Sequence, residues 1–407
     1  MCSIFGAIGL DIDDSIVRRI SSKAKDRGRD GGQVKQYRLE GGYNLVLGNW
    51  RATPTTELKV APPQPYDGII HNGIIANDVE LGNNDGSVDS TVLTKVIDRS
   101  SLESVVNSIE KIRGSYAMCI RGEDTAYAVV NYKPLYLLRI NKTIYFSSME
   151  RHLIEECEFG LRPQRVEPYT AVDLKTGESQ SLPRRENNRA LIVCSGGLDS
   201  TTVAYVLKEQ GYQVSLMHFL YGCRAETQEV ETIRRIADDL KAPVIYQAID
   251  YQSFTGESPL FDTNSDIAVG KEGAEFAIEW VPARNLVMLS HATAYAEANN
   301  FTTIALGNNL EESGSYPDNE EEFTTLFSKV LDYAVADGNR VKIVTPVGNL
   351  MKHEIVALGN RIGVPYELTW SCYRGGELHC GSCAPCFMRY TAFQRNGLKD
   401  PAIPRLL

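Results

Sequence analysis

The sequence pattern of this chain changes near residue 190, and this change constrains its fold more than any other feature. Before residue 175, short apolar runs alternate with polar residues, a period typical of antiparallel strands. The runs cover residues 3–8, 43–47, 68–71, 116–120, 126–130 and 144–147. From Ala190 onward, short apolar strands alternate with amphipathic helices. This second pattern predicts a parallel, doubly wound sheet of the α/β class.

Two domains follow from the change of pattern. The polar stretch 175–189 contains Gly, Ser, Pro and paired Asn, and we interpret it as the linker. We therefore predict one domain over residues 1–185 and a second over residues 186–407. A chain of 407 residues is long enough for two ordinary domains.

Composition and charge exclude several classes of protein. No apolar run approaches the roughly 20 residues that span a bilayer, and the N-terminus lacks the basic lead of a signal peptide. The net charge of -10 gives no global basic field for nucleic acid, although a local patch stays open. Nine cysteines, an odd number, argue against a secreted disulfide scaffold. We expect a cytoplasmic protein with no membrane partner.

Cys2 directly follows the initiator Met. Removal of Met1 would expose a thiol and an α-amine on one residue, and an amine with a pKa of about 7.7–8.0 can accept the thiol proton. This pair suits acyl transfer through a thioester. Taken alone, Cys2 is more simply explained as part of an ordinary strand.

Three further segments favour the chemical interpretation. Arg51 follows an apolar strand and could bind an α-carboxylate through a bidentate pair. Asn72 and Gly73 sit at a strand end, where an amide and a backbone N–H could form an oxyanion hole. Asp89 precedes a predicted helix over residues 89–97, and it could hold an α-ammonium group or simply cap the helix.

Together, these segments resemble the class II glutamine amidotransferases. The matching pieces are Cys2-x-Ile-x-Gly, Arg27-Gly-Arg-Asp-Gly, Arg51-Ala-Thr, His71-Asn-Gly and Asp89-Ser. The resemblance implies an αββα sandwich with an N-terminal nucleophile and glutamine as the ammonia source. It implies Cys2 as the nucleophile, Asn72 and Gly73 as the oxyanion hole, and Arg51 and Asp89 as the glutamine clamp. Asn49 and Thr91 depart from the family pattern.

The segment from Cys194 to Ser200 reads Cys-Ser-Gly-Gly-Leu-Asp-Ser between a strand and a helix. Successive glycines let a backbone wrap an anion, and a helix N-terminus adds N–H donors. The alternative is a glycine turn capped by a polar side chain. In this setting the motif resembles the PP-loop ATP pyrophosphatases, which implies ATP with Mg²⁺. The residues concerned are Ser195, Gly196, Gly197, Asp199 and Ser200.

Four cysteines crowd into a short C-terminal segment with the spacing C-x7-C-x2-C-x2-C. They are Cys372, Cys380, Cys383 and Cys386. Four thiolates with chelating C-x2-C pairs predict a closed tetrahedral Zn²⁺ site with a structural role. Buried free thiols and an iron-sulfur cluster are the alternatives.

The second half also resembles 7-cyano-7-deazaguanine synthases. Matching pieces include residues 195–200, 281–285, 313–318, and the run from Thr369-Trp-Ser-Cys through Cys386 to Arg389. The resemblance implies that Tyr316 and Asp318 face a 7-deazaguanine. It also implies that Arg284 and Lys352 lie near phosphates or the reacting group.

The combination of a glutaminase with such a synthase resembles the amidotransferase-synthase fusion assigned to archaeosine formation. Glu320 stands where the synthase pattern has Arg. An Arg side chain would attract a substrate carboxylate, whereas the Glu320 side chain would repel it and attract a cationic formamidine product. This favours addition of ammonia to the nitrile of 7-cyano-7-deazaguanine. The alternatives are conversion of the carboxylate to the nitrile, and a degenerate deazaguanine-binding or defence module.

Several properties cannot be read from the sequence. The acceptor could be a free base, or a base carried in tRNA or DNA. The sequence leaves two alternatives for ATP, consumption or no consumption, because nitrile amidation does not require it. A homo-oligomer is possible, and the sequence does not settle the oligomeric state.

Overall fold

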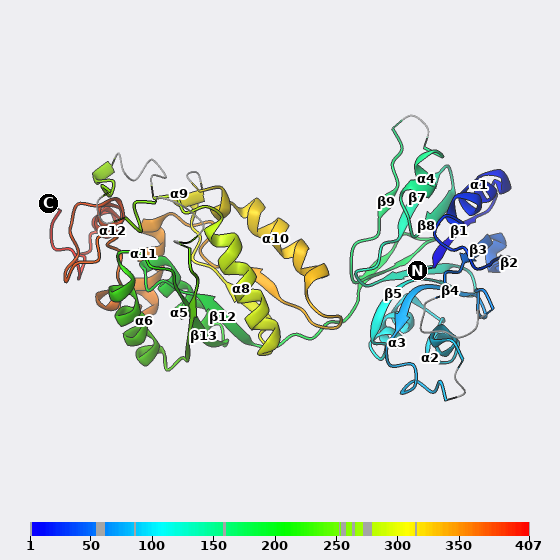
Figure 1. The fold of residues 1–407 in the computed structure, drawn as a ribbon, viewed down its shortest axis with the longest axis horizontal. Helices are drawn as coiled ribbons and strands as arrows, with labels where there is room; N and C mark the ends of the chain where they lie inside the picture. Colours follow the sequence, from blue (N-terminus) through cyan, green and yellow to red (C-terminus); the bar gives the residue numbers. More distant parts are fainter. Residues whose placement is uncertain are drawn as a thin grey trace. The chain divides into compact units, whose positions relative to one another are not determined.

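The computed structural model describes residues 2–53, 62–84, 87–157, 160–251, 253, 258–262, 265–271, 279–313 and 316–406. These residues form two compact units (Figure 1). Unit 1 comprises Met1–Arg184 with Ala336–Gly338, and unit 2 comprises Arg185–Val335 with Asn339–Leu407. The main division falls next to the predicted boundary, whereas the assignment of 336–338 to unit 1 was not expected. Across the described ranges, no helix is both long enough and apolar enough to span a membrane.

Unit 1 contains two antiparallel sheets within its described residues. The first has the order β2-β3-β1-β8-β7-β9 and the second the order β11-β10-β6-β5-β4. The strands of the first are β1 (Ser3–Gly9), β2 (Gly32–Arg38), β3 (Asn44–Trp50), β7 (Tyr136–Ile140), β8 (Thr143–Ser147) and β9 (Gln164–Arg165). Those of the second are β4 (Ile69–Ile75), β5 (Gly114–Arg121), β6 (Ala126–Val130), β10 (Thr170–Asp173) and β11 (Ser179–Ser181).

Helices cover the outer face of each sheet, so unit 1 is the predicted four-layer αββα sandwich. Helices α1 (Asp14–Ala24) and α4 (Arg151–Ile154) lie on the first sheet, while α2 (Leu93–Val96) and α3 (Leu102–Ile109) lie on the second (Figure 1). Two short 3-10 turns, η1 (Glu40–Gly42) and η2 (Asp89–Val92), complete it. Between the sheets, Ile4 and Leu45 of one pack with Ile70 and Ala117 of the other.

Local sequence explains both a confirmed and a missed element. Asp13 caps α1 by accepting the Ser15 N–H at 2.8 Å, and Ile16, Val17 and Ile20 bury one face of that helix. The predicted linker, in contrast, contains β11, which pairs with β10 in an antiparallel register. Its residues are Ser-Gln-Ser, a polar edge strand without the alternation that signals a strand.

Unit 2 is built on a parallel sheet with the order β14-β13-β12-β15-β16. Its strands are β12 (Arg189–Val193), β13 (Gln213–Leu220), β14 (Val244–Ala248), β15 (Thr303–Ala305) and β16 (Lys342–Val344). The longer helices are α5 (Leu198–Glu209), α6 (Glu226–Leu240), α8 (Arg284–Ala298), α10 (Glu321–Ala334), α11 (Lys352–Ile362) and α12 (Ala384–Arg395). Shorter turns are α9 (Leu310–Ser313), η3 (Pro317–Asn319) and η4 (Tyr366–Leu368).

Apolar side chains cover both faces of this sheet. Helices α8 and α10 contribute to the core on one face, and α5, α6, α11 and α12 contribute to the core on the other. This is the predicted doubly wound arrangement. The strand order reverses between β12 and β15, which in such sheets opens a crevice at the carboxyl ends of the strands.

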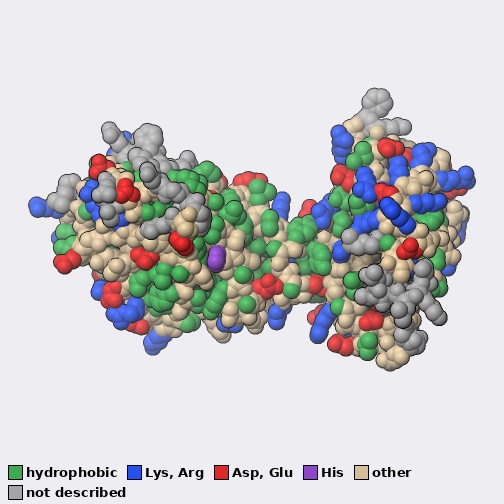
Figure 2. All heavy atoms as spheres, viewed as in Figure 1, with side chains coloured by type: hydrophobic (Ala, Val, Ile, Leu, Met, Phe, Trp, Pro, Cys, Tyr) green, Lys and Arg blue, Asp and Glu red, His purple; other side chains and the backbone are tan. Residues whose placement is uncertain are grey.

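Charge is mixed on the molecular surface. On the face drawn in Figure 2, Lys and Arg side chains are interspersed with Asp and Glu side chains over both units. This agrees with the absence of a global basic field in a chain of net charge -10.

Candidate active sites

The glycine loop of unit 2 joins β12 to α5. Gly196 has φ +78, and a Cβ there would lie 2.7 Å from Thr232 Cγ2, so only glycine is accommodated. Gly197 caps α5, and its N–H donates to Ser195 Oγ at 3.3 Å. Ser195 Oγ and Ser200 Oγ are 3.4 Å apart. The loop therefore presents hydroxyl and N–H groups at a helix N-terminus, a geometry that suits a phosphate.

A cavity of about 260 Å³ lies beside this loop, at the carboxyl ends of the strands. It is lined by residues that are far apart in the sequence, from β12 to α12. Seven of the predicted site residues line it: Ser195, Gly197, Asp199, Ser200, Arg284, Tyr316 and Lys352. Other lining residues used below are Val193, His218, Phe219, Glu229, Leu306, Glu311, Glu312 and Arg389.

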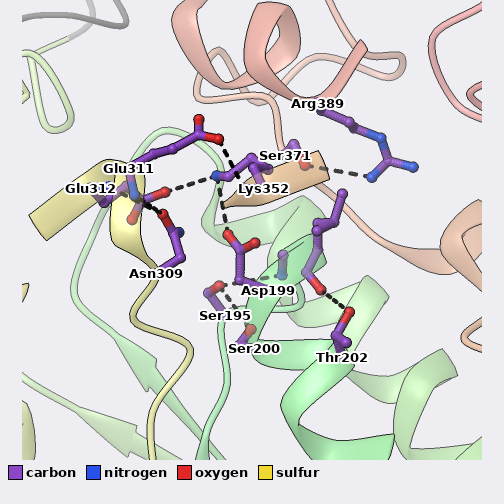
Figure 3. Close-up of polar contacts among 12 residues, drawn as sticks. Ser195, Asp199, Ser200, Thr202, Asn309, Glu311, Glu312, Lys352, Ser371 and Arg389 are labelled. Carbon is purple, nitrogen blue, oxygen red and sulfur yellow. Dashed lines mark hydrogen bonds and ion pairs between the residues drawn. The ribbon is translucent and has the colours of Figure 1, made fainter. Parts of the chain in front are cut away.

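Lys352 connects two acidic side chains at the cavity wall (Figure 3). Its Nζ lies 3.1 Å from Asp199 Oδ2 and 2.8 Å from Glu312 Oε1, while its backbone N–H donates to Glu311. Burial alone would lower the pKa of Lys352, but the negative charges of Asp199 and Glu312 raise this pKa by more than burial lowers it. Lys352 therefore stays protonated. Burial raises the pKa of Asp199 to about 6 despite Lys352. One cation thus serves two carboxylates, and Asp199 Oδ1 is buried without a hydrogen-bond partner in the described chain.

Arg284 begins α8 and lines the same cavity. Among the described residues, no carboxylate lies within ion-pair distance of its guanidinium. Tyr316 also lines the cavity, and its ring stacks on Trp280 with centroids 6.1 Å apart. This part of the wall offers a cation beside an aromatic surface.

Asp318 and Glu320 were also predicted to face the substrate, and neither is among the lining residues. Asp318 is buried, and its Oδ2 accepts the backbone N–H of Asn285 at 3.1 Å, near the start of α8. Glu320 is exposed at the N-cap of α10. In this structure Asp318 supports the first turn of α8, and the Glu320 side chain lies at the surface.

The four clustered cysteines meet in space. Their sulfur atoms all lie within 4.8 Å of one another. Backbone N–H groups of Ser382 and Cys383 donate to Cys380 Sγ at 3.4 and 3.3 Å, contacts that favour a thiolate. Four Zn–S bonds of about 2.3 Å give a tetrahedron with edges of about 3.8 Å. The donor set fits one tetrahedral ion better than a four-iron cluster, whose thiolates bind separate irons.

The predicted glutaminase residues of unit 1 come from strands of both sheets. Asn72 and Gly73 were expected at a strand end, but they lie in the middle of β4, because pairing with β5 continues to Ile75. Ser3 pairs with Trp50, so Cys2 and Arg51 are the next residues on β1 and β3. Cys2 Sγ lies 4.0 Å from the Ala52 carbonyl, and Arg51 is buried. β4, which carries Asn72 and Gly73, packs across the sandwich against β1 and β3.

Asn72 and Gly73 have features expected of an oxyanion hole. Both polar atoms of the Asn72 amide are buried and have no hydrogen-bond partner in the described part of the chain. A Cβ on Gly73 would lie 1.8 Å from the Ser115 carbonyl oxygen, so a side chain is excluded there. A buried amide without partners is costly unless a ligand satisfies it.

Asp89 lies beside the same strand and belongs to a hydrogen-bonded network. Its Oδ2 accepts the Ile75 N–H at 2.6 Å, and its Oδ1 accepts the Ser90 N–H at 2.7 Å. Ser90 Oγ is 2.8 Å from His71 Nδ1. The network joins Asp89 to His71, the residue that precedes Asn72, so it connects the carboxylate to the middle of β4.

The chain is similar to known proteins over nearly its full length. A family model described as "Queuosine biosynthesis protein QueC" matches residues 189–397. A protein from Sulfolobus acidocaldarius named 7-cyano-7-deazaguanine synthase is 39% identical, over 98% of this chain and 99% of its own length. The chain belongs to the QueC family.

Some relatives match only about half of this chain. A 7-cyano-7-deazaguanine synthase from Methanothrix thermoacetophila is 41% identical over 52% of this chain and 97% of its own length. Among solved structures, the glutamine phosphoribosylpyrophosphate (PRPP) amidotransferase from B. subtilis aligns with 95% of this chain and 96% of its own, at 15% identity and a TM-score of 0.36. Membership of a synthase family makes this QueC chain an enzyme.

Glu229 and His218 also line the cavity, and neither was predicted from the sequence. Glu229 lies on α6 and faces the cavity, where burial raises the pKa of its carboxyl to about 7. Its spacing with Ile233, Ile236 and Leu240 puts it on the apolar face of α6, and this signal could have revealed it. His218, at the end of β13, has no comparable signal because its strand is apolar on both faces.

Proposed function

We propose that this chain is a glutamine- and ATP-dependent 7-cyano-7-deazaguanine synthase, which converts 7-carboxy-7-deazaguanine into its nitrile. Relatives that match it over nearly their full length carry that name. The observation that carries the proposal is that the glycine loop and Arg284 face one cavity. A nucleotide and a substrate carboxylate would meet there.

Arg284 is the proposed partner of the substrate carboxylate. Its planar guanidinium suits bidentate binding of a carboxylate or a phosphate. Since the described residues provide it with no ion-pair partner, a bound anion would satisfy its charge without breaking an existing pair. Tyr316 beside it offers a ring on which a flat base can stack.

ATP supplies the leaving groups that this reaction needs. A carboxylate oxygen attacks the α-phosphorus, pyrophosphate leaves, and ammonia then displaces AMP to form the amide with loss of one proton. A second adenylation, at the amide oxygen, lets AMP leave with loss of two protons and gives the nitrile. Ser195, Gly197, Ser200 and Lys352 are the proposed phosphate ligands.

Glu229 is the proposed acceptor of these protons. A base is most effective when its pKa is near the working pH, and burial raises the pKa of this carboxyl to about 7. Among the described residues, its side chain accepts one hydrogen bond, a long one of 3.9 Å from Cys223 Sγ. The carboxyl therefore keeps hydrogen-bonding capacity for a reacting group.

Two metals accompany the proposal. Mg²⁺ bound with ATP would neutralise phosphate charge, and Asp199 would hold it through Oδ1, which lacks a partner in the described chain. Zn²⁺ would hold the segment from Cys372 to Cys386 together. The Zn²⁺ role is structural, because all four ligands are cysteines.

Unit 1 is proposed to release ammonia from glutamine. Cys2 attacks the side-chain amide, and its α-amine takes the thiol proton and passes it to the nitrogen that leaves as ammonia. Water then hydrolyses the thioester to glutamate and the free thiol. Asn72 and Gly73 hold the oxyanion, while Arg51 and Asp89 hold the α-carboxylate and α-ammonium of glutamine. The buried Asn72 amide, with no partner in the described residues, supports this role.

Addition of ammonia to the nitrile, giving the formamidine, is the second candidate. The sequence favoured it because Glu320 replaces an Arg of the synthase pattern. Glu320, however, is exposed and does not line the cavity, while the cation Arg284 does. The substitution at 320 therefore carries less weight than the adenylation loop.

Product analysis by mass spectrometry separates the candidates. The enzyme receives glutamine with the carboxy base, the nitrile base, or nitrile-bearing tRNA or DNA, each with and without ATP. We expect the nitrile from the carboxy base, only with ATP, and one pyrophosphate for each AMP. Formamidine from any nitrile substrate, with no nitrile from the carboxy base, would replace the first candidate by the second. No product from any substrate would favour a binding module.

A further inference from the structure

His218 is a buried histidine whose two ring nitrogens have different surroundings. It lies near the end of β13 and is 1% exposed. Its Nδ1 is 3.0 Å from the carbonyl oxygen of Cys194, the first residue of the glycine loop. A carbonyl only accepts, so Nδ1 carries the proton, and in the neutral ring Nε2 is an acceptor.

The acceptor Nε2 is buried and has no hydrogen-bond partner among the described residues. Burial lowers the pKa of His218, so the ring stays neutral and Nε2 stays available. Tyr246, its pairing partner on β14, meets the ring edge-on with centroids 6.1 Å apart. A buried acceptor without a donor is costly in the empty protein and is satisfied when a ligand supplies an N–H.

The position of His218 relates it to the nucleotide loop. Val193 pairs with Met217, so Cys194 and His218 are the next residues on adjacent parallel strands. His218 lines the cavity together with Val193, Phe219 and Leu306, which supply apolar surface for a flat ring. The charged cluster of Asp199, Glu312 and Lys352 comes from α5, α9 and α11.

From this arrangement we propose that His218 Nε2 accepts a hydrogen bond from the exocyclic amino group of the adenine of ATP, and so selects ATP over nucleotides with a carbonyl at that position. The inference rests on the proposed ATP-dependent function. The same N–H donor chemistry exists on the 7-deazaguanine substrate. The loop contact through Cys194 favours the nucleotide, and the experiment distinguishes the two sources.

The first test needs only the wild-type chain. ATP and inosine triphosphate differ at this edge of the ring, where the amino donor of adenine is replaced by a carbonyl acceptor. Equilibrium titration should show about tenfold tighter binding of ATP, which is about 1.4 kcal/mol. Equal affinity for the two nucleotides would overturn the proposal. Because titration requires no turnover, its result is independent of which reaction the enzyme performs.

Two variants then locate the effect. His218→Asn keeps a donor near the Nδ1 position and lacks the acceptor at Nε2, so it should lose the preference for ATP. His218→Gln places an amide oxygen near the Nε2 position and should recover most of it. His291→Asn, an exposed histidine on α8, is the matched control and should bind like wild type.

The KM values identify the ligand. We expect His218→Asn to raise the KM for ATP about tenfold and to leave the KM for the carboxy base unchanged. A rise in the KM for the base alone would assign the acceptor to that substrate and overturn the proposal. If His218→Asn does not fold, a His218→Gln variant that prefers inosine triphosphate would overturn it equally. Failure of nitrile synthesis with an intact ATP preference would contradict the proposed function and leave His218 assigned.

Discussion

Lys352 Nζ lies 3.1 Å from Asp199 Oδ2, which joins the start of α11 to the first turn of α5 at the nucleotide loop. The two residues are far apart in the sequence and meet only in the fold. Since Lys352 also contacts Glu312 at 2.8 Å, the loop is held by a cation that is shared between two carboxylates.

Replacing Lys352 by Met should destabilise unit 2 and abolish ATP binding. Removal of a buried cation leaves uncompensated carboxylates, a change that costs about 3–5 kcal/mol in fully buried pairs. We expect a loss of up to about 3 kcal/mol, because Glu312 keeps 32% of its side chain exposed. Denaturant unfolding and ATP titration measure both effects. Lys329→Met, at an exposed position on α10, is the control, and equal losses in both variants would contradict the role of Lys352.

Glu229→Gln should change how the stability of unit 2 depends on pH. Burial raises the pKa of Glu229 from 4.5 to about 7, so the folded state binds this proton more tightly than the unfolded state. The resulting stability is complete below pH 4.5 and is lost as the pH rises to 7. The variant lacks this loss. Its unfolding free energy relative to wild type should therefore rise between pH 5 and 7, by at most about 1.4 kcal/mol per pH unit, and level off above.

The control for this prediction lies on the same helix. Arg234 and Arg235 hold the pKa of Glu231 at about 2, so its contribution is lost only as the pH falls well below 4.5. Glu231→Gln should therefore give a profile parallel to wild type from pH 5 to 8. A parallel profile for Glu229→Gln as well would show that Glu229 does not titrate as described.

Cys2→Ala should abolish glutamine-dependent synthesis and preserve synthesis from free ammonia. The reason is the separation of functions, since the thiol lies in unit 1 and the nucleotide loop lies in unit 2. Product formation is measured with glutamine and with an ammonium salt at the same pH. A folded Cys2→Ala protein that has lost the ammonia-driven reaction would refute the division.

Cys383→Ser should lower the bound Zn²⁺ below one per chain and destabilise unit 2. Binding energy at a site closed by four thiolates is folding energy, so loss of a ligand reduces both. Metal analysis and thermal unfolding provide the measurements. Cys157→Ser, which changes a free cysteine of unit 1, is the matched control. If the Cys383→Ser protein retained full zinc content and thermal stability, the four cysteines would not form the predicted site.

Neighbouring residues near Tyr316 show where sequence reasoning fails. Tyr316, Asp318 and Glu320 were predicted to face one substrate, yet only Tyr316 lines the cavity. The turn η3 spans only Pro317–Asn319, and the backbone is extended at Tyr316 before it and at Glu320 after it. Within the turn, Asp318 accepts the Asn285 N–H of α8, whereas Glu320 lies beyond the turn and is exposed. A motif defined by its order in the chain does not specify the direction of each side chain.

The sequence by itself determined the elements whose chemistry is local in the chain. The glycine loop, the cysteine spacing and the His71-Asn72-Gly73 segment each require neighbouring residues, and the periods of 2 and 3.6 distinguish the two halves. Only the tertiary structure decided which distant residues share the cavity. Glu229, His218 and Glu312 come from α6, β13 and α9, and they meet because parallel strands bring their carboxyl ends to one edge. Burial then raises the pKa of Glu229, lowers the pKa of His218, and leaves His218 Nε2 without a donor among the described residues. These effects arise only after the chain has folded.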